Sequence, residues 1–120
     1  MSLKANVRHS GDVAIVDLAG RIRLGEDTGL VRNTIKELIA SGHKNVLLNL
    51  KDVNYIDSSG LGEMVGAYAS VSQAGGKIKL LNVHDRVSDL LQVTKLYTVF
   101  VAFSDEAEAL RSFKAEAARV

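Results

Sequence analysis

Apolar and polar residues alternate at the start of the chain, a pattern that is typical of β-strands. Two such segments, Lys4 to His9 and Val13 to Leu18, flank the turn-forming sequence Ser10-Gly11-Asp12, so we expect a β-hairpin. The segment from Gly20 to Asp27 is polar and contains two glycines, which predicts a loop.

A helical pattern follows this predicted loop. Apolar positions recur at intervals of three and four residues, which predicts an amphipathic helix. Its inner face would consist of Leu30, Val31, Thr34, Ile35, Leu38 and Ile39. Asp27 or Thr28 can cap the start of this helix, and Gly42 is expected to end it.

The middle of the chain predicts a strand, a helix and a second strand. Val46 to Leu50 is short and nearly all apolar, which favours a strand that is covered on both faces and followed by a loop. The next helix should end at Gly75-Gly76. Lys77 to Val83 is the next predicted strand, with Lys77 and Lys79 on its solvent face. The predicted inner residues of the helix are Leu61, Met64, Val65, Tyr68 and Val71.

The last third of the chain predicts a short helix, a strand over Val99 to Phe103, and a final helix capped by Ser104. Strands and helices alternate after the hairpin, so the predicted fold class is α/β, with helices packed on a mixed sheet in one domain, 1–120. The predicted inner residues of these two helices are Val87, Leu90, Leu91 and Val93, and then Ala107, Leu110, Phe113 and Ala117.

The composition fits one soluble domain of 120 residues. The 15 basic and 14 acidic residues leave a net charge of +1, so no basic surface for nucleic acid is indicated. The absence of cysteine excludes disulfides and cysteine-based metal sites. No apolar run is long enough to span a membrane, and the N-terminus lacks the apolar region of a signal peptide. We therefore expect a cytoplasmic protein without a membrane partner.

The segment Tyr55-Ile56-Asp57-Ser58-Ser59-Gly60-Leu61-Gly62 lies between a predicted strand and a predicted helix. A helix start needs a side-chain oxygen that accepts a hydrogen bond from a free backbone N–H. Asp57, Ser58 and Ser59 can each supply one, and a single cap is sufficient. At least one hydroxyl should therefore remain free, at the carboxyl end of a strand, where open α/β sheets place their sites.

Three glycines follow in or near the predicted helix: Gly60, Gly62 and Gly66. Each costs about 1 kcal/mol relative to alanine, which suggests that something approaches the backbone closely. We expect the underlying sheet to account for part of this, and a partner protein or a phosphate for the rest. A phosphate on Ser58 would lie at a helix N-terminus, which favours an anion, while Asp57 would oppose the added charge.

Catalytic and metal-binding motifs are incomplete. A nucleophile elbow centred on Ser58 would have Gly60 as its second glycine, but Ile56 replaces the first, so a serine hydrolase using Ser58 is a weak alternative. The phosphate-binding frame G-x-x-x-x-G-K-[ST] is missing around Gly75-Gly76-Lys77.

The histidines His9, His43 and His84 are scattered along the sequence. Their order alone does not exclude a Ser-His-Asp triad, but no two of them have the spacing of metal ligands. We expect no catalytic residue, no cofactor and no metal site.

The block Asp57 to Gly62, with Asn49-Leu50 before it and a helix ending in Gln73-Ala74-Gly75-Gly76 after it, closely resembles the STAS domain of bacterial anti-sigma factor antagonists. The similarity runs over nearly the whole chain, and its specific part surrounds Ser58. It implies a STAS-like mixed β-sheet with an opening antiparallel hairpin, about five strands and four helices packed on it.

The resemblance also implies a function without catalysis. Such proteins, when unphosphorylated, bind an anti-sigma factor that is also a GHKL-type serine kinase, and so release a sigma factor. The kinase phosphorylates the first serine of the motif, here Ser58, and a metal-dependent serine phosphatase restores it. The resemblance implies a monomer or weak dimer. The surrounding partner-binding loop would consist of Asp57, Ser59, Gly60, Leu61 and Gly62.

One segment departs from the family pattern. Many relatives carry G-x-L-D before the first helix, where the acid helps to meet the partner, whereas this chain has Gly20-Arg21-Ile22-Arg23. Arg21 and Arg23 are therefore candidate contacts for a partner with an acidic patch. Other STAS domains are scaffold subunits of stress-signalling complexes or accessory subunits of lipid-transport complexes. An intact Asp57-Ser58-Ser59-Gly60 favours the phosphorylation switch over these roles.

Overall fold

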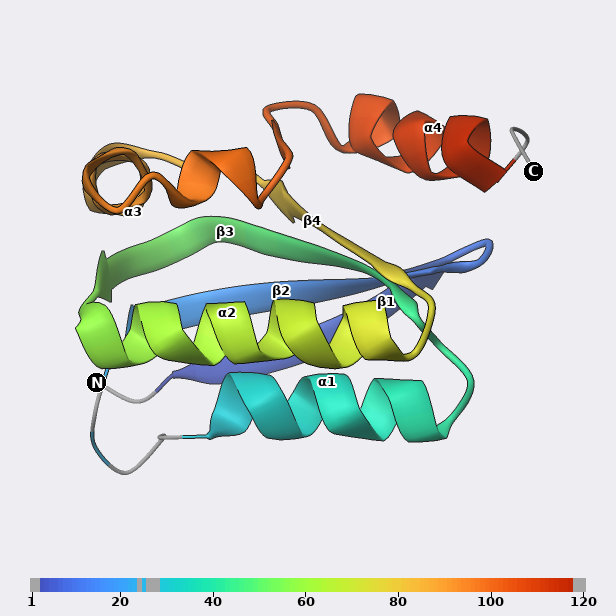
Figure 1. Ribbon diagram of the computed structural model, residues 1–120, viewed down its shortest axis with the longest axis horizontal. Coiled ribbons are helices and arrows are strands. Elements are labelled where there is room, and N and C mark those ends of the chain that lie inside the picture. Colours follow the sequence, from blue (N-terminus) through green and yellow to red (C-terminus); the bar gives the residue numbers. More distant parts are fainter. Residues whose placement is uncertain (1–2, 24, 26–28, 118–120) are drawn as a thin grey trace.

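The structure is a computed structural model that describes residues 3–23, 25 and 29–117. Five strands form one sheet in the order β1-β2-β3-β4-β5 (Figure 1). The strands are β1 Lys4–Ser10, β2 Val13–Ile22, β3 Asn45–Ile56, β4 Lys77–Leu81 and β5 Ala102–Phe103. The helices are α1 Leu30–Ala40, α2 Ser58–Gln73, α3 Asp85–Val93 and α4 Glu106–Ala117, with a short 3-10 helix at Leu96–Thr98.

The sheet is mixed, as predicted. β1 pairs antiparallel with β2, with Ser10 opposite Val13 across the tight turn, which confirms the opening hairpin. The other strands are parallel to β2, and each follows its neighbour through a helical connection. The predicted fold class is confirmed.

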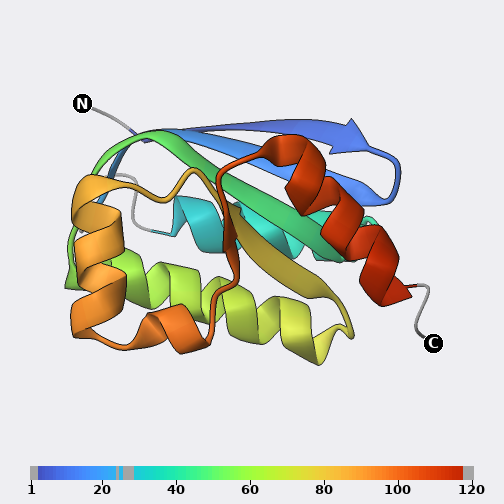
Figure 2. The same ribbon diagram turned by 90° about the horizontal axis from the view of Figure 1, so that it is seen from above.

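Helices cover both faces of the sheet. Side chains alternate along β3, so Val46 and Leu48 point to one face and Leu47 to the other, and all three are fully buried. α1, α2 and α3 contribute to the larger core on the first face, while Ala109 and Phe113 of α4 pack on the second. Figure 2 shows α4 across that second face and α3 at the end of the sheet. This double cover explains why the predicted strand from Val46 to Leu50 is almost wholly apolar.

The strand ends differ from the predicted ones: β2 and β3 are several residues longer, and β4, which ends at Leu81, and β5 are shorter. β2 continues through Gly20 to Ile22, which was predicted as loop, and β3 continues to Ile56. These extensions pair with each other, with Ile22 opposite Ile56, after two register shifts at which β3 has an additional residue relative to β2. The predicted strand from Val99 to Phe103 shrinks to β5, because Phe100 turns into the core against Tyr68.

Two predicted N-terminal helix caps are not confirmed: that of α1 lies outside the described residues, and that of α4 is wrong. α1 begins after Gly29, whose left-handed backbone provides no side-chain cap, and Asp27 and Thr28 are not among the described residues. Gly42 does end this helix, with a positive φ of 89°. At α4 the cap is Asp105 rather than Ser104, since Asp105 Oδ1 accepts from the Ala107 N–H at 2.9 Å.

Lys79 was predicted on the solvent face of β4 and is instead 3% exposed. α4 covers it: Lys79 Nζ donates to Ser112 Oγ at 2.8 Å and lies 4.7 Å from the centre of the Phe113 ring. An alternating pattern reveals the two faces of a strand, but not whether a distant helix covers the second one. Lys77 is exposed, as predicted.

Some predicted inner positions of the helices also face solvent. Val93 is 81% exposed, Val65 is 37% exposed, and Ala107 is exposed. Val87, Leu91 and Phe113 are buried, as predicted. The side chain of Ala117 lies outside the described part of the chain. In the described part of the chain, no helix has the length and apolar character needed to span a membrane.

Candidate functional site

The candidate site is the turn that joins β3 to α2. β3 ends at Ile56 and α2 begins at Ser58, so Asp57 occupies the capping position in an extended conformation. Asp57 Oδ1 accepts a hydrogen bond from the Gly60 N–H at 2.8 Å, and the Asp57 N–H donates to the Ile22 carbonyl at 3.2 Å. Asp57 is half-buried, and these two hydrogen bonds hold both its side chain and its backbone in place.

Ser58 and Ser59 are exposed, and neither hydroxyl is hydrogen-bonded to any residue that the structure describes. Since Asp57 is the cap, both serine hydroxyls are free of that role. The sequence-based expectation of a spare hydroxyl in this turn is confirmed. The first turn of α2 thus presents two accessible nucleophilic oxygens beside a helix N-terminus, where a negative charge is favoured.

The three glycines of α2 differ in what surrounds them. A Cβ on Gly60 would lie 2.0 Å from the Ile22 carbonyl oxygen, so Gly60 is required by the contact between α2 and β2. A Cβ on Gly66 would make ordinary contact with the Arg32 side chain, 3.6 Å from its Nε. A Cβ on Gly62 would meet nothing within 4 Å, so packing within the described chain does not explain Gly62.

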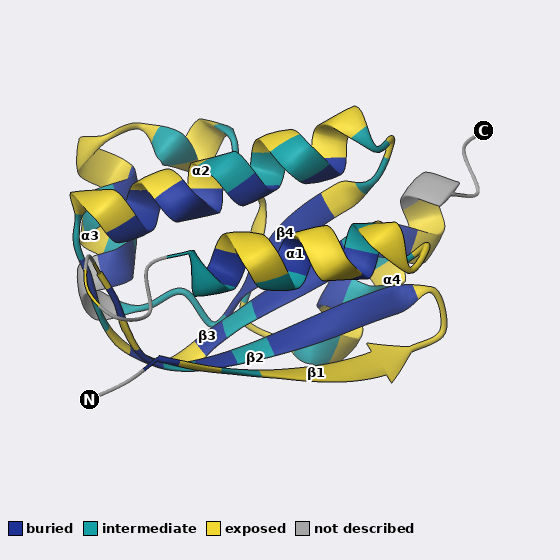
Figure 3. Cartoon of the chain, turned by 90° about the horizontal axis from the view of Figure 1, so that it is seen from below, coloured by how far each residue is buried: buried dark blue, intermediate teal, exposed yellow. Residues whose placement is uncertain are grey.

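The outer face of the first turns of α2 carries small residues and is accessible to solvent. Figure 3 shows that α2 buries the side facing the sheet and exposes the other. Ser58, Ser59 and Gly62 are exposed, and Val65, one turn further, is 37% exposed. Another protein can approach this part of the helix backbone closely.

Two residues of the predicted contact loop are internal. Gly60 and Leu61 are buried, and the Leu61 side chain, 6% exposed, belongs to the main core. They can influence a partner only by positioning the turn.

Arg21 and Arg23 lie next to this turn, because β2 and β3 run parallel and end at the same edge of the sheet. Both are exposed, on either side of the buried Ile22. The Arg21 guanidinium carbon is 5.9 Å from the centre of the Tyr55 ring on β3. The structure thus brings both arginines to the edge that carries Ser58.

No histidine contacts Ser58. His84 Nε2 lies 3.2 Å from the Leu50 carbonyl and 3.1 Å from the Lys51 carbonyl, and the His9 ring lies beside the His43 ring at the other end of the sheet. A Ser-His-Asp arrangement around Ser58 is therefore not formed, since a triad needs its histidine hydrogen-bonded to the serine. Within the described ranges, no three histidine, aspartate or glutamate side chains gather as metal ligands.

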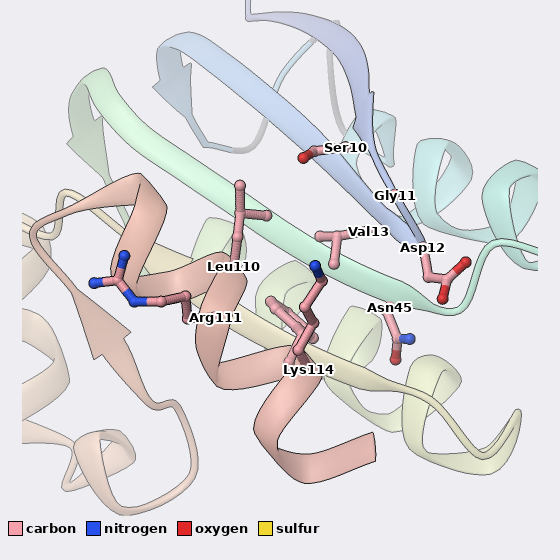
Figure 4. A pocket seen from close by; sticks show the side chains of 9 residues that line it. Ser10, Gly11, Asp12, Val13, Asn45, Leu110, Arg111 and Lys114 are labelled. Carbon is pink, nitrogen blue, oxygen red and sulfur yellow. The ribbon is translucent and has the colours of Figure 1, made fainter. Parts of the chain in front are cut away.

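A separate hollow of about 260 Å³ lies between the β1–β2 turn and α4 (Figure 4). Val13, Leu110 and Phe113 form its apolar part, and Asn45 stands at its edge. Asn45 begins β3 and Ser58 follows the end of β3, so this hollow is at the opposite end of the sheet from the candidate site.

Known proteins similar to this chain identify its family. The STAS domain family matches residues 4–109. The chain belongs to the STAS domain family. The anti-sigma F factor antagonist of Paenibacillus polymyxa is 31% identical over 111 residues, which is 92% of this chain and 94% of that protein. The anti-sigma-B factor antagonist of Bacillus subtilis is 32% identical over 96 residues, or 80% of this chain and 86% of that protein.

The fold comparison agrees with this STAS membership. The crystal structure of a Thermotoga maritima protein assigned as an anti-sigma factor antagonist superposes with a TM-score of 0.84 at 25% identity, over 92% of this chain and 94% of that one. These matches extend over nearly the full length of the STAS domain. The resemblance seen around Ser58 is therefore part of a relationship that includes the whole sheet.

Proposed function

We propose that this STAS domain protein is an anti-sigma factor antagonist controlled by phosphorylation of Ser58. Unphosphorylated, it binds an anti-sigma factor that is also a GHKL-type serine kinase, and the sigma factor held by that kinase is released. The main support for this proposal is that Asp57 caps α2, while the Ser58 hydroxyl is exposed and makes no hydrogen bond to a described residue.

A phosphate on Ser58 is compatible with the fold. It adds about −1.5 to −2 charges at neutral pH, and the N-terminus of α2 offers N–H groups and a partial positive charge to balance them. The cap does not have to change, because the Asp57 carboxylate stays on the Gly60 N–H. The modification therefore acts on what the turn can bind, and not on whether α2 forms.

The contact surface in this proposal is the outer face of α2 with Ser58, Ser59, Gly62 and Val65, flanked by Arg21 and Arg23. Gly62 supports it, because a glycine that no internal contact requires leaves the helix backbone open to a close partner. A phosphate on Ser58 would place new charge and bulk at the edge of this surface. Interfaces reject an unpaired charge at a cost of several kcal/mol.

The cycle requires a second enzyme. A metal-dependent serine phosphatase would remove the phosphate from Ser58 and restore the binding form. The exposure of Ser58 suits this, since both enzymes must reach the same oxygen. The protein itself would act as a binding module and not as an enzyme, because no histidine is placed to activate Ser58.

The direct test is phosphate transfer. The purified chain is incubated with ATP, Mg²⁺ and each GHKL-type serine kinase encoded in the same genome, and the modified residue is located by mass spectrometry. We expect one phosphate, on Ser58, and none in Ser58→Ala. Ser59→Ala is the matched control, since Ser59 is also exposed and lies in the same helical turn. Phosphate on Ser59 alone, or no transfer by any of these kinases, would refute the proposal.

A further inference from the structure

His9 and His43 lie side by side although they are far apart in the sequence. Their ring centroids are 4.7 Å apart and their planes are tilted by 46°. The sheet produces this proximity: His9 of β1 pairs with Ala14 of β2, and Ala14 pairs with Val46 of β3. His43 belongs to the turn just before β3, so it meets the edge strand there. Sequence spacing does not reveal this pair.

Both rings are available to a ligand. His9 is exposed and His43 is half-buried. Neither imidazole ring makes a hydrogen bond or an ion pair with any described residue, apart from the contact of the two rings with each other. His84 differs, because its Nε2 lies against the carbonyls of Leu50 and Lys51. A neutral imidazole carries one nitrogen with a free lone pair, so the pair offers two such nitrogens on one patch of surface.

The separation of the rings permits both to bind the same metal ion. With metal–nitrogen bonds of about 2.0–2.1 Å, and a ring nitrogen about 1.1 Å from its centroid, each centroid lies about 3.2 Å from a bound ion. Two such rings are then about 4.5 Å apart for a right-angled N–metal–N arrangement and about 5.2 Å apart for a tetrahedral one. The observed 4.7 Å falls between these values. Rotation about the last side-chain torsion, which is soft in histidine, aims the nitrogens at one ion.

We propose that His9 and His43 together bind one divalent transition-metal ion of the imidazole-preferring class, such as Zn²⁺, Ni²⁺ or Cu²⁺. Such ions favour nitrogen ligands, whereas Mg²⁺ and Ca²⁺ favour oxygen. No third histidine or acidic side chain joins the pair among the described residues, so water fills the remaining positions and the ion exchanges readily. His43 lies just before the start of β3 and Ser58 just after its end, so the two sites are at opposite ends of this strand. The metal-site proposal therefore does not depend on the phosphorylation proposal.

The test is a calorimetric titration of the tag-free chain with ZnCl₂ at about pH 7.5, since a histidine ligand must lose its proton to bind a metal. We expect one ion per chain. His9→Gln and His43→Gln should each weaken binding by at least about tenfold, because even changes outside the ligand shell weaken metal binding by about 10- to 100-fold. His84→Gln is the matched control and should bind as the wild type does. MgCl₂ should give no binding, and acidification should weaken Zn²⁺ binding because protons compete for the same nitrogens.

A second measurement separates ligation from folding. Zn²⁺ should shift the side-chain ¹⁵N resonances of His9 and His43 and leave those of His84 in place. His9→Gln changes an exposed strand position, so it remains decisive even if His43→Gln unfolds. The proposal is overturned if the wild type binds Zn²⁺ no more tightly than the His9→Gln/His43→Gln double variant, or if His84→Gln loses as much affinity as His9→Gln.

Discussion

The Cα of Gly60 in α2 lies against the backbone carbonyl of Ile22 in β2, where a Cβ would come within 2.0 Å of the oxygen. The same carbonyl accepts the N–H of Asp57, the residue that caps α2. The end of β2 therefore fixes the position of the first turn of α2 on the sheet. This contact joins the end of β2, which carries Arg21 and Arg23, to the turn that carries Ser58.

Gly60→Ala should destabilise the protein strongly. The added methyl group meets backbone on β2, which cannot rotate away as a flexible side chain would, so α2 has to shift. We expect a loss of about 3 kcal/mol or more in the free energy of unfolding, the upper part of the range for overpacking. Urea denaturation measures it. An unchanged midpoint would show that α2 does not sit on Ile22 as described.

Gly62→Ala should have the opposite effect on stability. No atom lies within 4 Å of the added Cβ, and the φ of Gly62 is not in the left-handed region. Removing the backbone freedom of glycine should raise the free energy of unfolding by about 0.4–1 kcal/mol. If the outer face of α2 is the partner surface, the same variant should bind the anti-sigma factor more weakly, as measured by surface plasmon resonance. Unchanged affinity would remove Gly62 from that surface.

These two glycines show how much of the site could be predicted from the sequence. The motif predicted a helix start capped by Asp57, Ser58 or Ser59, with a spare hydroxyl, because capping depends on residues a few positions apart. It could not tell Gly60 from Gly62. Only the pairing of β2 with β3 places Ile22 beneath Gly60, and that pairing joins distant parts of the chain.

The same limit applies to the fold. Val46 to Leu50 was predicted as a buried strand because its own residues are apolar, whereas the extension of β2 to Ile22 depends on pairing with β3. Lys79 was wrongly predicted to face solvent, because α4, which covers it, lies about 30 residues further along the chain. His9 and His43 are a further case of neighbours that only the sheet brings together.

Acid should weaken the ion pair between Arg8 and Asp17, which joins the two strands of the hairpin. Arg8 Nη2 lies 2.9 Å from Asp17 Oδ1 and 2.8 Å from Glu106 Oε1, and Asn49 also donates to Asp17 at 2.8 Å. The hydrogen bond from Arg8 lowers the pKa of Asp17, with a smaller contribution from Asn49. A carboxyl group whose pKa is lowered by folding stabilises the protein above its unfolded value, about 3.9, and loses that stabilisation as pH falls through the folded value.

We therefore expect the free energy of unfolding to fall as the pH is lowered from about 5 toward 2, and to fall less in Arg8→Gln. The difference should be below about 1 kcal/mol, because the pair is partly exposed to solvent. Urea denaturation at several pH values measures it. Lys4→Gln is the control, since it removes a positive charge from the same exposed strand. Equal acid sensitivity in wild type and Arg8→Gln would contradict the prediction.

Arg23→Asp should slow association with the partner. Arg23 is exposed beside the turn that carries Ser58, at the position where we propose a contact with an acidic patch. Charges at the rim of an interface act mainly on the association rate and its salt dependence. Stopped-flow measurements at low salt should show slower binding, and the difference should shrink as salt is added. Lys44→Asp, the same charge change at the opposite end of β3, is the control; if it slows association equally, the effect belongs to net charge.

Ser58→Asp should abolish binding to the anti-sigma factor while leaving the melting temperature nearly unchanged. The aspartate introduces charge at the first residue of α2, where the helix N-terminus tolerates it, but where the proposed partner surface leaves room only for a hydroxyl. Ser58→Ala should bind constitutively, with or without kinase activity. Calorimetric binding and thermal unfolding, measured on both variants, give the two quantities that are needed.

The alternative is that Ser58 serves only the helix start. Ser58→Ala would then lose about 1 kcal/mol of stability, and Ser58→Asp, which is itself a good cap, would behave as the wild type. The hydrogen bond from the Gly60 N–H to Asp57 argues against this, because it assigns the cap to the preceding residue. Asp57→Ala should therefore show the loss of about 1 kcal/mol that Ser58→Ala does not. Normal partner binding by Ser58→Asp would leave Ser58 without a role as a switch.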